Sequence, residues 1–174
     1  MKTLVLVFHP DMAKSRANAA LMAAARKLPS DAVTVRDEYA LCPDGTIDVA
    51  AEQRLIEQHD RIVLQFPLYW YSSPALLKQW EDEVLAYGWA YGPGGEALKG
   101  KEIMVATTAG GPASEYQTED NGATIGEVLS PYRMMARYTR AAWLEPFVVF
   151  RSMELTDAEL ATSAARYADA LLAG

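Results

Sequence analysis

The sequence predicts an α/β domain in which a doubly wound parallel sheet of five strands has helices on both faces. Five short apolar runs alternate with helical segments or long loops over the 174 residues. The runs are continuously aliphatic and β-branched, which is typical of strands covered on both sides. No internal repeat, low-complexity tract or linker interrupts this alternation, so residues 1–174 are expected to form one domain.

The first third of the chain predicts two strands and two helices. Residues 3–8 read TLVLVF and predict the first strand. Residues 17–28 are rich in Ala and Leu, which favour a helix, and Pro29 ends that helix. Residues 32–36 predict the second strand, and residues 48–59 predict a helix with Asp48 as its N-cap.

The middle of the chain repeats this pattern. Residues 61–66 read RIVLQF and predict a buried third strand, which ends at Pro67. Residues 74–87 predict a helix, because Pro74 suits a first turn and Gly88 lies just beyond the last one. Residues 103–108 read IMVATT and predict the fourth strand.

The last third of the chain predicts two helices and one strand. A helix is expected at residues 125–138 and the fifth strand at residues 147–150. The last helix is expected at residues 156–172. Thr156 and Glu159 have the spacing of a capping box, which marks its start.

Charge and composition exclude several classes of protein. The chain has 16 Lys and Arg against 23 Asp and Glu, a formal charge of -7, and no basic cluster, so no nucleic-acid partner is expected. The single Cys42 and the two histidines, His9 and His59, predict neither a disulfide framework nor a metal site. His59 is expected at the surface. The apolar run at residues 4–8 is too short for a membrane span or a signal peptide, so a cytoplasmic protein is expected.

Ligands of such sheets bind beyond the carboxyl ends of the strands, where the strand order reverses. If the order is 2-1-3-4-5, that crevice lies above the first, third and fourth strands. The loops expected there span residues 9–18, 67–73 and 108–117. These stretches are also the most unusual in the sequence, so they form the candidate site.

The first loop has the groups that bind a phosphate. It opens a helix, and a helix N-terminus offers unpaired N–H groups and a positive dipole end. Ser15 and Asn18 can add side-chain donors, and Arg16 or Lys14 can add charge. The alternative is that Ser15 only caps the helix. The chain contains no G-x-x-x-x-G-K-[ST] run, which disfavours a kinase or an ATPase.

The second loop places three consecutive aromatic residues, Tyr69, Trp70 and Tyr71, between Pro67 and Pro74. This is unusual for a connection that normally faces water. The rings offer flat surfaces to a planar ligand. The alternative is that they fill the core or a subunit contact.

The third loop carries Gly110 and Gly111 directly after a strand, which lets the main chain approach a ligand closely. A plain turn is the alternative, and Tyr116 could reach back over the same crevice. Together the three loops fit a mononucleotide with a planar conjugated ring. Flavin mononucleotide (FMN) is the common ligand of that kind.

The longest motif resembles that of a known family. Residues 65–80 read QFPLYWYSSPALLKQW, which is similar to the hallmark of the flavodoxin-like NAD(P)H:quinone oxidoreductases. GWAYG at 88–92, TTAGG at 107–111 and LEP at 144–146 follow in the family's order, and residues 9–10 and 15–18 also match. The resemblance covers nearly the whole chain. It is strongest to the short bacterial members of the KefF type, which are ancillary to glutathione-regulated potassium efflux.

The resemblance implies a flavodoxin-like fold and a homodimeric flavoprotein that passes two electrons from NADH or NADPH to a quinone. At 174 residues the chain resembles the FMN-binding type more than the longer members that bind FAD. The groups implied to bind the flavin ribityl chain and phosphate are His9, Ser15, Arg16, Ala17 and Asn18. The residues implied to line the isoalloxazine ring are Pro67, Leu68, Tyr69, Trp70, Thr108, Ala109, Gly110 and Gly111.

The resemblance also implies roles in the reaction. The N–H groups of Gly110 and Gly111, with the Tyr116 hydroxyl, would stabilise negative charge on the reduced flavin. Trp89 and Tyr91 would bound one slot that nicotinamide and quinone occupy in turn, which predicts ping-pong kinetics. The sequence departs from the family in two ways. It has Ala109 in place of a Gly, and it lacks the His that mammalian relatives carry after the Gly-Gly turn.

Two other functions stay open. A flavin-bound dimer could regulate a potassium-efflux transporter, which would place it peripherally at the inner membrane. A one-electron carrier of the flavodoxin kind also holds flavin, but it has no need of residues 89–92 as part of a nicotinamide pocket. Steady NAD(P)H consumption on addition of a quinone would separate the enzyme from both.

Overall fold

The computed structural model describes residues 1–120 and 122–173. The strands are β1 (Thr3–Val7), β2 (Val33–Asp37), β3 (Arg61–Pro67), β4 (Glu102–Thr108), β5 (Ala142–Trp143) and β6 (Phe147–Val149). The helices are α1 (Ala17–Ala25), α2 (Glu38–Leu41), α3 (Val49–Glu57), α4 (Ala75–Val84), α5 (Ile125–Val128), α6 (Ser130–Tyr138) and α7 (Asp157–Leu172).

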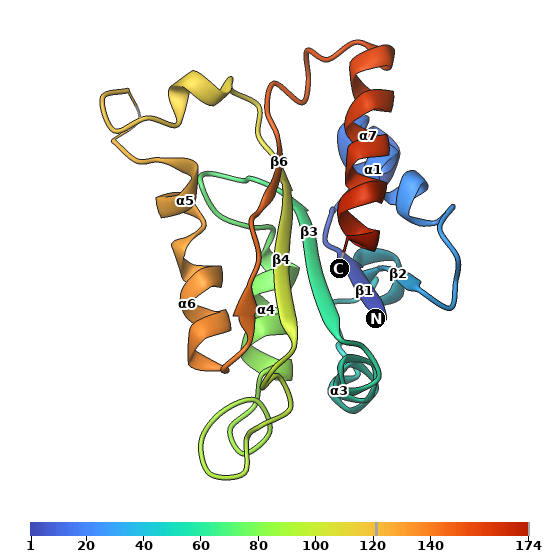
Figure 1. Cartoon of the computed structure of the whole chain (residues 1–174), viewed down its shortest axis with the longest axis vertical. Coiled ribbons are helices and arrows are strands. Elements are labelled where there is room, and N and C mark those ends of the chain that lie inside the picture. Colours follow the sequence, from blue (N-terminus) through green and yellow to red (C-terminus); the bar gives the residue numbers. More distant parts are fainter. Residues whose placement is uncertain (121, 174) are drawn as a thin grey trace.

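The strands form one parallel sheet in the order β2-β1-β3-β4-β5, which confirms the predicted order (Figure 1). The fifth position differs from the prediction because two short strands share it. β5 pairs with the start of β4, and β6 pairs with its end. Pro146, between the two strands, has no N–H to donate, which fits the interruption of the ladder.

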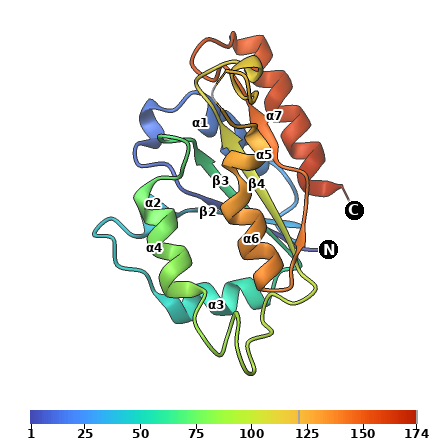
Figure 2. The same cartoon turned by 90° about the vertical axis from the view of Figure 1, so that its left-hand side faces the viewer.

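The sheet is covered on both faces, as its apolar strands predict. Leu4 and Leu6 of β1 pack in a cluster with α3, α4 and α6, whereas Val5 and Val7 pack with α1 and α7. Figures 1 and 2 show these two helical layers on opposite sides of the sheet. Because successive strand residues point to opposite faces, a run that is apolar at every position needs both layers.

The starts of α3 and α7 follow local signals, whereas α1 and α4 end at Ala25 and Val84, three residues before their predicted ends. Asp48 caps α3, accepting the Ala51 N–H at 3.0 Å, and Thr156 forms the predicted capping box at the start of α7. The single helix expected at residues 125–138 is wrong, because the structure has α5 and α6 instead. Pro131 cannot donate to the helical ladder, so it suits the first turn of a new helix.

The expected surface position of His59 is also wrong. Its side chain is buried, with ring nitrogens 2.7 Å from the Leu55 carbonyl oxygen and 2.9 Å from Thr34 Oγ1. The end of α3 therefore packs against β2 through a polar contact. No helix in the described ranges is both long enough and apolar enough to cross a membrane.

Candidate functional site

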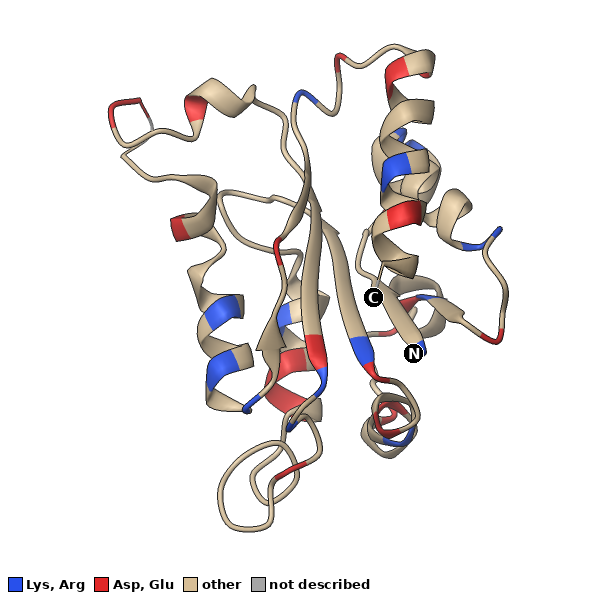
Figure 3. Cartoon of the chain, viewed as in Figure 1, with Lys and Arg blue, Asp and Glu red and all other residues tan. Residues whose placement is uncertain are grey.

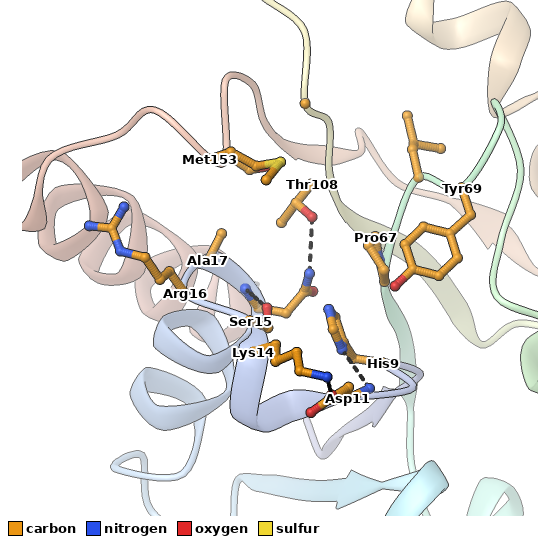
Figure 4. Close-up of a pocket in the computed structure, with 14 residues that line it drawn as sticks. His9, Asp11, Lys14, Ser15, Arg16, Ala17, Pro67, Tyr69, Thr108 and Met153 are labelled. Atoms are coloured by element: carbon orange, nitrogen blue, oxygen red, sulfur yellow. Dashed lines mark hydrogen bonds and ion pairs between the residues drawn. The ribbon is translucent and has the colours of Figure 1, made fainter.

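A pocket of about 560 Å³ lies beyond the carboxyl ends of β1, β3 and β4 (Figure 4). This volume lies within the usual range of small-molecule sites. The three predicted loops line this pocket together with Ser152 and Met153, which follow β6. The lining residues are His9, Asp11, Lys14, Ser15, Arg16, Ala17, Asn18, Pro67, Leu68, Tyr69, Thr108, Gly110, Ser152 and Met153.

The start of α1 presents main-chain donors to this pocket. Ser15 Oγ accepts the Asn18 N–H at 3.1 Å, so Ser15 does cap the helix. Within the described chain, the N–H groups of Arg16 and Ala17 have no hydrogen-bond acceptor. Free N–H groups at the positive end of a helix dipole are a site for an anion such as phosphate.

The two cations of the first loop already have protein partners. Lys14 Nζ lies 2.7 Å from Asp11 Oδ2. The Arg16 guanidinium donates to the Leu155 carbonyl at 2.9 Å and to Asp157 Oδ1 at 2.8 Å. Figure 4 shows the Arg16 side chain extending from the pocket toward α7. The main chain at residues 16–17 is therefore better placed to meet a phosphate than the Arg16 side chain.

His9 is held as a neutral donor at the base of the first loop. Its Nδ1 accepts the Asp11 N–H at 3.1 Å, which leaves the ring proton on Nε2. Burial lowers the His9 pKa from its ordinary value of 6.5, and this outweighs the opposing effect of Asp11. The imidazole thus offers an N–H group to the pocket at neutral pH.

The second loop divides its aromatic residues between the pocket and the solvent. Pro67, Leu68 and Tyr69 line the pocket. Tyr69 and Ser72 exchange two main-chain hydrogen bonds of 3.0 Å, which closes a tight turn. Trp70 at its tip has a φ of 50° and is 94% exposed, so in this chain it lies outside the pocket lining.

The third loop contributes Thr108 and Gly110 to the lining. The side chain of Ala109 is fully buried, and its N–H donates to the Val149 carbonyl at 2.8 Å. A Cβ on Gly110 would meet no atom within 4 Å, whereas a Cβ on Gly111 would lie 2.0 Å from Glu115 Oε2. Gly110 therefore adds no bulk to the pocket lining, and a side chain at Gly111 would require the exposed Glu115 carboxylate to move.

Four residues assigned to the reaction lie outside the pocket lining: Gly111, Tyr116, Trp89 and Tyr91. Tyr116 packs against Phe150 with ring centroids 5.4 Å apart, and burial raises the pKa of its hydroxyl. The Trp89 indole N–H donates to Glu57 Oε1 at 2.8 Å, at the amino edge of the sheet. Figure 1 shows the loop that carries Trp89 and Tyr91 at the amino edge of the sheet, whereas the pocket lies at the carboxyl edge.

Ser152 and Met153 were not identified from the sequence. They follow β6, and hydrogen bonds from Arg151 N to the Gly111 carbonyl and from Ser152 N to the Ala109 carbonyl, both 3.0 Å, bring them to the pocket. Because these contacts use only main-chain atoms, no residue type in the sequence signals them. Asp11, the partner of Lys14 and His9, was also not singled out.

Residues 1–171 match the family model described as "Flavodoxin-like fold". Among curated proteins, the uncharacterized NAD(P)H oxidoreductase YrkL of Bacillus subtilis is 44% identical over 174 residues, covering 99% of each chain. The glutathione-regulated potassium-efflux system ancillary protein KefG of Escherichia coli is 42% identical over 169 residues, covering 97% of this chain and 91% of KefG.

Solved structures agree with this assignment. A chain from a thermophilic tryptophan halogenase of "Streptomycin violaceusniger" is 46% identical, with a TM-score of 0.95 and coverage of 98% and 99%. General stress protein 14 of Treponema denticola, in complex with FMN, is 45% identical, with a TM-score of 0.93 and the same coverage. An NADPH-quinone reductase from P. pentosaceus is 31% identical, with a TM-score of 0.88 over the whole of both chains. The chain belongs to the flavodoxin-like NAD(P)H:quinone oxidoreductase family, which confirms the resemblance found in the sequence.

Proposed function

We propose that this protein is an FMN-dependent NAD(P)H:quinone oxidoreductase. The supporting observation is a pocket at the carboxyl edge of the sheet, where free N–H groups at the start of α1 share a lining with Pro67, Tyr69 and Gly110. FMN in general stress protein 14 and the names of YrkL and the P. pentosaceus reductase support the same activity. The pocket gives no specific reason to propose halogenation.

The lining residues fit the parts of FMN. The N–H groups of Arg16 and Ala17 would hold the phosphate, and the Nε2–H of neutral His9 would donate to the ribityl chain or the phosphate. Pro67, Leu68 and Tyr69 would border the ring, and Gly110 would let the main chain approach it. Bound FMN supplies a ring that accepts hydride from NADH or NADPH and returns two electrons to a quinone.

The chain's contribution to the reaction is binding and charge stabilisation. The Gly110 N–H would stabilise negative charge at the edge of the reduced ring. The Gly111 N–H and the Tyr116 hydroxyl keep their proposed roles as further donors. Since one slot serves both substrates, we expect ping-pong kinetics.

We also propose that the active form is a homodimer. The outer face of α6 exposes Met134 and Tyr138 at 67% and 69%, beside a groove of about 650 Å³. Tyr91 packs on Tyr138 with ring centroids 5.4 Å apart, so it lies at the edge of this face. Trp89 and Tyr91 of a second copy could then border a pocket that they do not reach within their own chain.

Regulation of a potassium-efflux transporter is the second candidate, and the 42% identity with KefG favours it. Such a role would use the same flavin site, with turnover incidental. Co-purification with the transporter from a membrane extract would support it. Normal quinone turnover without any transporter association would favour the enzyme alone.

The proposal is tested by the visible spectrum of the purified protein and by NAD(P)H oxidation. The expected results are a flavin spectrum, a released chromophore with the mass of FMN, and oxidation of NADH or NADPH that depends on an added 1,4-naphthoquinone. Parallel lines in double-reciprocal plots would support ping-pong kinetics. A preparation that stays colourless after incubation with FMN would contradict the proposal.

A further inference from the structure

Four buried polar side chains form a continuous hydrogen-bonded network beneath the pocket. The Tyr167 hydroxyl on α7 donates to Gln65 Oε1 on β3 at 3.1 Å. Gln65 Nε2 lies 3.0 Å from the main-chain oxygen of Asn18 and 3.3 Å from Asn18 Oδ1. Asn18 Nδ2 donates to Thr108 Oγ1 at 2.9 Å. The exposed fractions of Tyr167, Gln65, Asn18 and Thr108 are 0%, 0%, 1% and 5%.

One main-chain carbonyl fixes the direction of every hydrogen bond in this network. The backbone oxygen of Asn18 can only accept, so the Gln65 atom beside it must be the amide nitrogen, and Gln65 Oε1 must face Tyr167. The same nitrogen requires an acceptor on the Asn18 side chain, so Asn18 Nδ2 must face Thr108. Thr108 Oγ1 therefore accepts a hydrogen bond from the protein interior.

Thr108 and Asn18 are the members of the network that line the pocket, and Thr108 is the one with a hydroxyl proton to donate (Figure 4). Its hydroxyl oxygen accepts from Asn18, and no residue of 1–120 or 122–173 provides an acceptor for its proton. A Thr hydroxyl has one proton and two lone pairs, so accepting from Asn18 uses one lone pair and leaves the proton available to a ligand in the pocket. The Thr108 hydroxyl is thus a donor suited to an acceptor oxygen or nitrogen of the ligand.

We propose that Tyr167, Gln65 and Asn18 are positioning residues that hold the Thr108 hydroxyl as a hydrogen-bond donor to the bound flavin. This inference rests on the proposed FMN site and adds a means of control from α7. Tyr167 is fully buried and does not line the pocket, so it acts only through Gln65 and Asn18. Hydrogen-bonded partners with fixed positions hold a ligand-binding group in the orientation that contacts the ligand.

A double-mutant cycle on FMN affinity tests the proposal. Apoprotein is titrated into FMN, and flavin fluorescence gives the dissociation constant for wild type, Thr108→Val, Tyr167→Phe and the double variant. Loss of one neutral hydrogen bond should weaken FMN binding about 3- to 10-fold in Thr108→Val. Tyr167→Phe should weaken it by a smaller factor, and the double variant should match Thr108→Val because the effect of Tyr167 passes through Thr108.

Thr107 provides a matched control next to Thr108. It is also buried on β4, but its hydroxyl donates to the Phe66 carbonyl at 2.8 Å, outside the network. Thr107→Val should leave FMN affinity unchanged, and Thr108→Ser, which keeps the hydroxyl, should recover most of the affinity that Thr108→Val loses. If Tyr167→Phe does not fold, Gln65→Met replaces it in the cycle. Circular dichroism and thermal unfolding confirm that each variant is folded.

The outcomes separate this inference from the proposed function. Wild-type apoprotein that does not bind FMN would overturn the proposed function and this inference with it. Wild type that binds FMN, with multiplicative effects of Thr108→Val and Tyr167→Phe, would overturn the network alone. Equal losses in Thr107→Val and Thr108→Val would overturn it as well. A second readout, the visible absorption of bound FMN, should shift in the same direction in Tyr167→Phe and Thr108→Val but not in Thr107→Val.

Discussion

Gly110 and Gly111 are adjacent, but the structure gives them different tasks. A Cβ at Gly110 would meet no atom within 4 Å beside the pocket, whereas one at Gly111 would require the exposed carboxylate of Glu115 to move. The sequence identifies the pair as a place of close approach. It does not separate the two, because the distinction depends on how the following turn folds back.

Gly110→Val should therefore weaken FMN binding at least 10-fold while leaving the fold intact. Gly110 lines the pocket and an added Cβ meets no protein atom within 4 Å, so we expect the Val side chain to take up space that the ligand needs. Flavin content of the purified variant and an FMN titration measure the effect. Gly126→Ala, on α5 and away from the pocket, is the control and should retain FMN. Wild-type flavin content in Gly110→Val would contradict the assignment of the third loop.

His9 predicts a pH dependence of stability. Its folded pKa is lowered from 6.5 by burial, so the unfolded chain takes up the proton first as pH falls. The stability that neutral His9 contributes is present above that value and is lost as pH falls below it. His9→Asn keeps an acceptor for the Asp11 N–H but does not titrate.

Unfolding free energies of FMN-free wild type and His9→Asn, measured by denaturant titration at about pH 7.5 and about pH 5.5, test this prediction. Wild type should lose stability relative to the variant at the lower pH. If the difference in unfolding free energy between wild type and His9→Asn is the same at both pH values, the lowered pKa of His9 is wrong.

The functions of Arg16 and Trp70 show the limit of sequence reasoning at this scale. Arg16 was predicted to bind phosphate from its place in the loop, but its guanidinium meets Asp157, 141 positions away. Trp70 has the residue type of a ring-binding group, yet its positive φ turns it into solvent. Neither a distant ion-pair partner nor the conformation of a tight turn is encoded in the local pattern.

At the scale of elements, a buried ion-pair cluster ties together β2, α2, α3 and α4. Arg36 pairs with Glu38 and Glu52, and the Trp80 indole N–H donates to Glu52 Oε2 at 3.0 Å. Burial and the nearby Glu52 raise the Glu38 pKa to about 7, although Arg36 opposes the shift. A carboxyl group of this kind favours the folded state most when it is protonated.

Glu38→Gln should flatten the pH dependence of stability. With a folded pKa of about 7 against an ordinary 4.5, wild type should lose stability as pH rises between those values, because the unfolded state ionises first. The variant lacks this loss, so wild type should become less stable relative to it as pH rises. Glu81, whose pKa is also raised to about 7, is present in both proteins and cancels in the comparison.

Thermal unfolding across this pH range measures the effect. The exposed Glu119→Gln is the control and should follow the wild-type curve. If the difference between wild type and Glu38→Gln does not change with pH, Glu38 is ionised throughout and the raised pKa is wrong.

Most elements were predictable because their signals are local. Continuous apolar runs marked the strands, and Asp48 and Thr156 marked helix starts. The four-residue α2 is too short to show a helical period, although Asp37 caps it through the Ala40 N–H at 3.2 Å. The division of the fifth strand into β5 and β6 was not predictable, because the two strands pair with different parts of β4. Such pairing is set by the tertiary structure and not by a local pattern.

Across the whole molecule, the aromatic loop at residues 85–101 and the flavin-sized pocket lie at opposite ends of the sheet (Figure 1). Figure 3 shows basic residues along α6, beside acidic positions on the neighbouring α4. An apolar face flanked by opposite charges suits a second copy in a two-fold arrangement. Because Trp89 and Tyr91 lie far from the pocket of their own chain, they can border a substrate only in a dimer. Their predicted role therefore depends on the predicted dimer.

Met134→Glu should convert the proposed dimer into a monomer, because it buries a charge at the α6 face. Light scattering should give the single-chain mass of 19.1 kDa, against twice that value for wild type. FMN should remain bound, while the KM for quinone rises as Trp89 and Tyr91 of the second copy are lost. Leu172→Glu, at an exposed site on α7, is the control and should stay dimeric. A dimeric Met134→Glu would place the interface elsewhere.

The last helix supports the pocket at two points without lining it: Asp157 at its start pairs with Arg16, and Tyr167 along its length donates to Gln65. The strands and loops that line most of the pocket are synthesised before it. When only residues 1–150 have emerged from the ribosome, the first loop lacks the contact of Arg16 with Asp157. The hydrogen-bonded network that ends at Thr108 lacks Tyr167. If the protein binds FMN as proposed, we expect capture of the flavin to come late in biogenesis, after the C-terminal helix has docked.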